Sequence, residues 1–307
     1  MCKMIVMCKN DAQTKKLIDT LMNINDVSSI MSNEMTFRRD SEGRNKHQTI
    51  EELGLKIDSE DLTLQERADL TQVLKNNADL FATSLLDLPG THLCEYEIDT
   101  GDAKPINCRP YRLSPTAQGI LDTEIDQMLK AGVIRPSDSN WGSPVMLVKK
   151  KSLDGKPCFR VVIDYRKLNA VSKPIAYTIP KLEDIVDAVG HAKPTRFSIM
   201  DLRSGYFQIP IKEGESKHKT AFNTQNNKFE FNVASFGLQG LPAYFSKIMS
   251  SIFRGISYKY MVHYIDDLLI YSPDVKTHIS HLQSACDRIR GANLRIHPQK
   301  SLLYKKG

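Results

Sequence analysis

The sequence predicts an α+β fold in which an antiparallel sheet is backed by helices. Helical and hairpin patterns follow one another without a regular strand–helix–strand repeat, which argues against a parallel sheet. Two apolar runs, Tyr260–Ile265 and Leu268–Ser272, flank a short polar turn and indicate a central β-hairpin. The composition, 41% hydrophobic and 25% charged over 307 residues, is typical of a globular protein with one large domain or two smaller ones.

Several segments carry apolar residues at helical spacing together with start or end signals. Ser114 and Pro115 provide an N-cap hydroxyl and a first-turn proline for a helix that Gly132 ends. Pro180 starts a second helix, with Gly190 as its expected terminator. Further helices are predicted over residues 62–80, from Pro242 onward and over residues 277–291.

The remaining short apolar segments are predicted to be strands. They are Pro144–Val148, Phe159–Ile163, Arg196–Met200, Gln208–Ile211 and Lys228–Val233. The first two bracket a basic loop. Between Val145 and Ile175 eight Lys and Arg residues stand against two Asp, so this segment alone carries an excess equal to the net charge of +6. Such a local concentration suits a polyanionic partner, although a basic loop is often merely solvated.

Membrane and secreted classes are not supported by the composition. No apolar stretch approaches the ~20 residues that span a bilayer, and the first ten residues lack the features of a signal peptide. The six cysteines form no Cys-x-x-Cys pair and no zinc spacing, which favours reduced thiols. We expect a cytoplasmic or nuclear protein that is not secreted.

Three aspartates are the strongest candidates for chemistry. Asp201 closes the predicted strand 196–200, and Asp266 and Asp267 lie at the turn of the central hairpin. Two-metal phosphoryl transfer needs carboxylates from separate elements that converge on cations ~3.5–4 Å apart. Mg²⁺ suits such a site because it prefers a few carboxylates, waters and phosphate oxygens. The alternative is an ordinary solvated Asp-Asp turn.

Seven sequence blocks in order carry a family resemblance. They are Gly132–Ser137, Trp141–Pro144, Phe159–Asn169, Asp201–Ile211, Lys219–Phe222, Phe236–Leu238 and Tyr264–Asp267. From about Leu80 to Lys300 the chain resembles the reverse transcriptases of retroviruses and long-terminal-repeat retrotransposons, most closely the gypsy type. The resemblance implies right-hand polymerase architecture, with fingers and palm over residues 89–307 and no thumb or primer grip. Residues 1–88 would be a partly helical N-terminal linker or extension.

The resemblance also implies roles for the acidic and basic residues. Asp201, Asp266 and Asp267 would be catalytic and would hold two Mg²⁺ ions, with Mn²⁺ as an alternative. Arg160 would contact the triphosphate of the incoming nucleotide, because its guanidinium fork suits phosphate. Either Lys149 or Lys150 would accompany it.

The other implied site residues surround the incoming nucleotide. Tyr206 would lie under the sugar and clash with a 2′-hydroxyl, whereas Phe236 and Gly237 would lie beside the nucleotide and template base. Lys300 is the candidate general acid for the leaving pyrophosphate. The chain departs from the family at Ser235, where proline is usual.

The implied function is an RNA-directed DNA polymerase that extends a primer. Its partners would be an RNA or DNA template with primer and deoxynucleoside triphosphates, with no membrane. Polyprotein neighbours (protease, ribonuclease H, integrase), a dimer and a virus-like particle are further expectations of the resemblance. One alternative is an inert retrotransposon remnant that binds nucleic acid. An RNA-dependent RNA polymerase is disfavoured, because Tyr206 would obstruct a ribonucleotide.

Overall fold

The computed structural model describes residues 52–55, 62–150 and 158–306, and its chain divides into two compact units. The first unit contains the described parts of Met1–Thr83, Ile179–Arg203 and Ile248–Gly307. The second contains the described parts of Ser84–Thr178 and Ser204–Lys247. Most of the predicted extension 1–88 and the tip of the basic hairpin lie outside the described residues. The predicted boundary at residue 88 stays a prediction.

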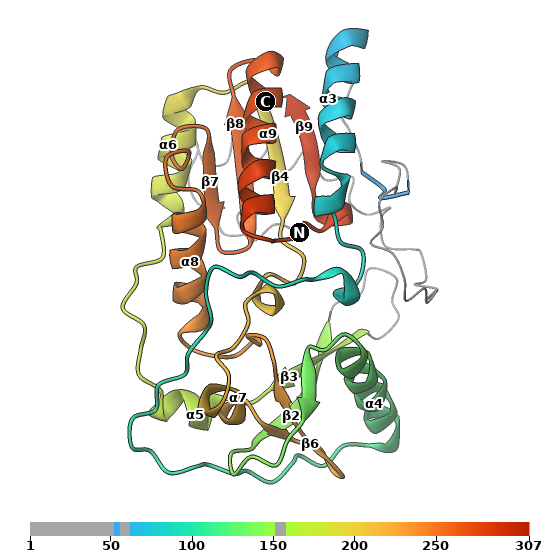
Figure 1. Ribbon diagram of the computed structural model, residues 1–307, viewed down its shortest axis with the longest axis vertical. Helices are drawn as coiled ribbons and strands as arrows, with labels where there is room; N and C mark the ends of the chain where they lie inside the picture. The colour runs from blue at the N-terminus through green and yellow to red at the C-terminus, as the bar shows by residue number, and fades with distance from the viewer. Residues whose placement is uncertain (1–51, 56–61, 151–157, 307) are drawn as a thin grey trace. The chain divides into compact units, whose positions relative to one another are not determined.

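The first unit is built on a four-stranded sheet with the order β7-β8-β4-β9 (Figure 1). Its strands are β4 (Arg196–Asp201), β7 (Met261–Tyr264), β8 (Asp267–Ser272) and β9 (Leu302–Lys306). All three pairings are antiparallel, which confirms the predicted sheet and its central hairpin.

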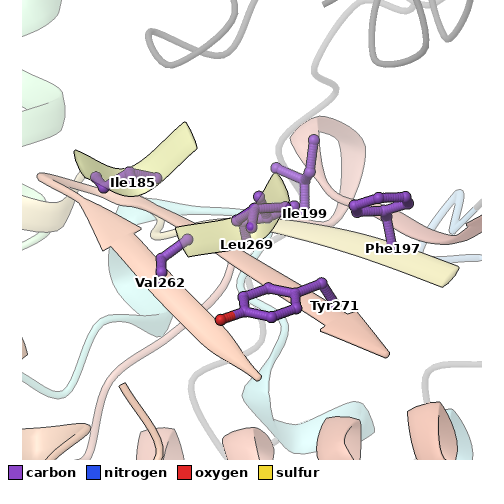
Figure 2. Packing of buried hydrophobic residues seen from close by; sticks show 7 residues of the cluster. Ile185, Phe197, Ile199, Val262, Leu269 and Tyr271 are labelled. Carbon is purple, nitrogen blue, oxygen red and sulfur yellow. The ribbon is translucent and has the colours of Figure 1, made fainter. Parts of the chain in front are cut away.

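Helices cover both faces of this sheet. Ile185 and Val189 of α6 (Leu182–Ala192) pack into a buried cluster with Phe197 and Ile199 of β4, which continues onto β7 and β8 (Figure 2). Each such side chain contributes about 1.5–3 kcal/mol when fully buried. Ser198 lies between the two β4 residues and therefore faces the other side. There it is hydrogen-bonded to a histidine of α9 (Val275–Gly291).

A helix from the N-terminal part of the chain packs on α9. Helix α3 (Leu64–Asn76) starts with a complete capping box between Thr63 and Glu66, and a 3₁₀ turn η2 (Ala78–Leu80) follows it. Phe81 then pairs with Ile296. Residues 62–83 therefore belong to the first unit.

The second unit is built on a five-stranded sheet with the order β1-β6-β5-β2-β3. Its strands are β1 (Ile134–Pro136), β2 (Ser143–Lys150), β3 (Cys158–Ile163), β5 (Phe222–Asn223) and β6 (Lys228–Phe231). The β2–β5 pairing is parallel and the others are antiparallel. The helices are α4 (Pro115–Lys130), α5 (Arg166–Val171) and α7 (Glu215–Lys219), and α8 (Leu241–Ile252) gives residues to both units.

Two element predictions were wrong. The predicted strand Gln208–Ile211 is replaced by a 3₁₀ turn η4 (Gly205–Gln208) and two isolated bridges. Gly190 lies inside α6, which ends instead at Lys193 with a positive φ of 43°. By contrast, the Ser114 cap of α4 is confirmed. No helix in the described ranges is long and apolar enough to cross a membrane.

Candidate active site

The turn between β7 and β8 determines where two of the three predicted aspartates lie. Tyr264 pairs with Asp267, so Ile265 and Asp266 form a two-residue hairpin loop. Ile265 has a φ of 55°, the sign that a type II′ hairpin requires at this position. A β-branched residue is rarely found there and stores strain, which is often the case at functional sites.

Asp201 and Asp267 lie directly opposite each other on neighbouring strands. Because cross-strand partners share a face of the sheet, both carboxylates extend the row formed by Ile199 and Leu269. Asp267 is 2% exposed. Two like charges in this arrangement repel each other, and a functional site is a common reason to retain such an arrangement.

Burial, opposed by the charge of Lys300 and helped by the nearby carboxylates of Asp266 and Asp267, raises the pKa of Asp201 to about 6. The Lys300 ammonium lies 3.5 Å from Oδ1 of Asp201, and it is half-exposed. This Oδ1 is buried and accepts no hydrogen bond. The ionised form of the Asp201 carboxylate is therefore disfavoured, and a bound cation would stabilise it.

Backbone hydrogen bonds hold these residues from outside the hairpin. The amide of His297 donates to the carbonyl of Asp201 at 2.7 Å. The amide of Leu202 donates to the carbonyl of Asp266 at 3.0 Å. The Ser301 hydroxyl accepts from the amide of Asp201 at 3.3 Å. No local pattern predicted these contacts of His297 and Ser301, because they join residues about 100 positions apart in the chain.

The carboxylates fit a hard divalent cation by their chemistry. They offer oxygen ligands at the ends of the two central strands, and one of these oxygens is buried and accepts no hydrogen bond. Among the described residues, no group of three or more His, Cys, Asp or Glu side chains is placed so that it could hold a metal ion. The roles of the three aspartates as ligands stay predictions.

A second set of predicted residues comes together within the second unit. The guanidinium of Arg160 on β3 lies over the ring of Phe236, 5.6 Å from its centroid. The Tyr206 ring contacts Phe236 on another side, with centroids 5.1 Å apart, and also packs edge-on against Phe245. Phe236 remains 37% exposed. Arg160 and Phe236 thus form an exposed cationic and aromatic surface, which the half-buried ring of Tyr206 adjoins.

Gly237 follows Phe236 in a conformation that favours glycine. Its φ is +98°, and an added Cβ would lie 3.2 Å from the carbonyl oxygen of Ile163. Lys149 and Lys150 are the last two residues of β2, but their side chains lie outside the described part of the structure.

Comparisons with known proteins agree with this fold. Residues 148–307 match the family described as reverse transcriptase (RNA-dependent DNA polymerase). The chain is 34% identical over 246 residues to the Retrovirus-related Pol polyprotein from transposon opus of Drosophila melanogaster. The aligned region covers 78% of this chain and 24% of that polyprotein. For the transposon gypsy polyprotein of the same organism the identity is 35%, over 74% of this chain and 22% of the relative. The chain thus spans about a quarter of the length of these relatives.

Solved structures show the same fold at low sequence identity. The foamy viral protease–reverse transcriptase in complex with dsDNA matches with a TM-score of 0.72 and 21% identity, covering 89% of this chain and 54% of that one. The complex of this enzyme with an RNA/DNA hybrid matches with a TM-score of 0.68 and 22% identity, over 79% and 32% of the two chains. This chain belongs to the reverse transcriptase family, as predicted.

Proposed function

We propose that this chain carries out RNA-directed DNA synthesis, by extending a primer on a template with deoxynucleoside triphosphates. The primer 3′-oxygen would attack the α-phosphorus, forming a new P–O bond as the bond to pyrophosphate breaks. The observation that carries the proposal is the cross-strand pair Asp201 and Asp267, next to Asp266. Asp201 has a raised pKa, and its buried Oδ1 accepts no hydrogen bond.

Asp201, Asp266 and Asp267 would hold two Mg²⁺ ions. The chemistry supplied by bound Mg²⁺ is activation of the 3′-hydroxyl and neutralisation of charge on the phosphoryl group. The protein's own contribution is to hold these carboxylates in fixed positions at the ends of β4 and β8 before substrate arrives. Lys300, whose ammonium is 3.5 Å from Asp201, is the candidate donor of a proton to the departing pyrophosphate.

The second unit would bind the incoming nucleotide. The exposed Arg160 guanidinium suits the triphosphate, and the Tyr206 ring would exclude a ribose 2′-hydroxyl. Phe236 contacts both of these side chains and would help to hold them in place.

Primer extension on an RNA template with a DNA primer, deoxynucleotides and Mg²⁺ tests the proposal. Incorporation should be lost in Asp266→Asn, which removes a charge and keeps the shape of the side chain. The matched control is Asp287→Asn, because Asp287 lies on α9 in the same unit with a half-exposed side chain. The control should extend primers as the wild type does.

Three results would refute the proposal. Full activity in Asp266→Asn would exclude the aspartate site. A folded wild-type chain that binds template–primer without incorporating nucleotide would favour an inert nucleic-acid-binding protein. Incorporation of ribonucleotides in preference to deoxynucleotides would favour RNA synthesis instead.

A further inference from the structure

The loop that carries Phe236 is held in place by a side chain from another element. Asn169 of α5 uses both ends of its carboxamide on this loop. Its Nδ2 donates to the carbonyl of Gly237 at 2.8 Å, and its Oδ1 accepts from the amide of Gln239 at 3.0 Å. One side chain therefore fixes two backbone groups about 70 residues away in sequence.

The same loop is anchored at two further points. The hydroxyl of buried Ser235 donates to the hydroxyl of Tyr165 at 3.3 Å, and that hydroxyl donates to the carbonyl of Thr220 at 2.8 Å. Gly237 approaches Ile163 closely enough that a Cβ would crowd its carbonyl. These anchors lie at β3 and α5, so the loop is tied to the segment that also carries Arg160.

Only the outer side of the loop is exposed. Phe236 points its ring to the surface between the Arg160 guanidinium and the Tyr206 ring. If the loop moved, Phe236 would leave both neighbours, and the flexible arginine would lose the ring on which it stacks. A cation–π contact at an exposed site is weak, so it holds Arg160 only while the ring is fixed.

We propose that Asn169 is a positioning residue for binding of the deoxynucleoside triphosphate. This inference rests on the proposed function, because it assumes that Arg160, Phe236 and Tyr206 face the nucleotide. Asn169 acts through the Gly237 carbonyl and the Gln239 amide, and it does not contact the substrate itself. Loss of these two hydrogen bonds should weaken nucleotide affinity about tenfold while the unit stays folded.

The experiment measures nucleotide binding without chemistry. The full chain is bound to an RNA template with a DNA primer that ends in a dideoxynucleotide, and the dissociation constant of the complementary deoxynucleoside triphosphate is measured with Mg²⁺. The variants are Asn169→Ala and Asn169→Asp. The aspartate keeps the acceptor for Gln239 but cannot donate to Gly237, so it separates the two arms. Thermal unfolding reports whether each variant is folded.

Asn223→Ala is the matched control. Asn223 is another asparagine of the second unit that makes two hydrogen bonds, to Asn107 and to the carbonyl of Cys108, each 2.7 Å long. Within the part of the chain that the structure describes, its side chain makes no hydrogen bond to the 235–239 loop. Asn223→Ala should therefore affect stability without changing nucleotide affinity.

We expect Asn169→Ala to bind the nucleotide about tenfold more weakly, and Asn169→Asp, which keeps the bond from Gln239, to lose less affinity than Asn169→Ala. In both variants KM should be raised more than kcat is lowered in extension assays. Unchanged affinity in both variants would overturn the positioning role, as would an equal loss in Asn223→Ala. A wild-type chain that binds the nucleotide but never incorporates it would refute the proposed function alone, since the affinities would still test Asn169. A wild type that binds no nucleotide would overturn both.

Discussion

The carboxylate of Asp201 is held at a cost to stability when no cation is present. Burial and the neighbouring Asp266 and Asp267 raise its folded-state pKa to about 6, above the ordinary 3.8. The folded state thus binds more protons between these values, so stability falls as the pH rises from 3.8 to 6 and stays reduced above 6. At neutral pH the cost is at most about 3 kcal/mol.

Asp201→Asn should therefore stabilise the metal-free protein at pH 7, and primer extension should be lost. Urea unfolding in a chelator, at pH 5 and pH 7, measures the effect, which should be larger at pH 7. Asp287→Asn serves as the control and should change neither value by more than ~0.5 kcal/mol. A metal-free Asp201→Asn protein less stable than the wild type at pH 7 would contradict this electrostatic picture.

Tyr206 should decide between deoxynucleotides and ribonucleotides. Its ring is fixed by Phe236 and Phe245, with centroid distances of 5.1 and 5.4 Å. Tyr206→Ala removes the ring and should reduce the preference for deoxynucleotides by about tenfold or more. Competition between the two nucleotide classes in primer extension measures this ratio. Tyr206→Phe keeps the ring and should keep the preference, and a loss of preference there too would assign the effect to the hydroxyl.

Helix α9 is joined to the sheet by a buried histidine. His278 is hydrogen-bonded through Nε2 to Ser198 of β4 and through Nδ1 to Ser272 of β8, at 2.8 and 2.9 Å. Burial, together with His281 and Arg196, lowers its pKa to about 3. In the unfolded chain this histidine binds a proton below about pH 6.5, whereas in the folded protein it stays neutral until about pH 3. Stability should therefore fall as the pH decreases from 6.5 toward 3.

This histidine should contribute a slope approaching ~1.4 kcal/mol per pH unit below pH 6. Urea unfolding of His278→Gln between pH 5 and pH 7.5 should show lower stability throughout and a shallower slope than the wild type. The exposed His191 of α6 provides the control, and His191→Gln should leave the slope unchanged. An unaltered slope in His278→Gln would mean that other groups govern the acid response.

Helix α3 is attached to α9 by a buried asparagine. Nδ2 of Asn77 donates to Gln283 at 3.0 Å, and its Oδ1 accepts from Arg290 at 2.8 Å. Asn77→Ala leaves these partners unsatisfied and should cost about 2 kcal/mol of unfolding free energy in urea. Its exposed neighbour Asn76 is the control, because Asn76→Ala should cost less than ~1 kcal/mol. Equal small effects would show that α3 is only loosely attached.

The sequence predicted the elements that depend on local patterns. The β7–β8 hairpin followed from two apolar runs around Asp266 and Asp267, and the start of α4 followed from Ser114. The segment 208–211 looked like a strand because it is apolar, yet it has no continuous partner strand to pair with. Asn169 and His297 were not assigned roles, since their contacts join residues far apart in sequence, which no local pattern encodes.

The chain's basic residues are only partly available to a nucleic acid. In the basic segment, Arg166 is paired with Asp164 at 2.7 Å, and Lys173 is paired with Asp99 at 2.7 Å. Arg160 instead lies against an aromatic ring, and its guanidinium forms no ion pair with any other described residue. Affinity for a polyanion should therefore come from fewer cations than the eight Lys and Arg between residues 145 and 175.

Template–primer affinity should fall with salt in proportion to the cations that contact phosphate. For duplex contacts the logarithm of the association constant falls by ~0.9 per phosphate neutralised for each tenfold rise in salt. In titrations at several salt concentrations, Arg160→Gln should leave this slope unchanged while nucleotide affinity falls, because the proposed function assigns Arg160 to the nucleotide's triphosphate. A slope reduced by about one would instead place this guanidinium on a phosphate of the template or primer. Lys276→Gln, on the first turn of α9, should alter neither measurement if binding follows the cationic surface of the second unit.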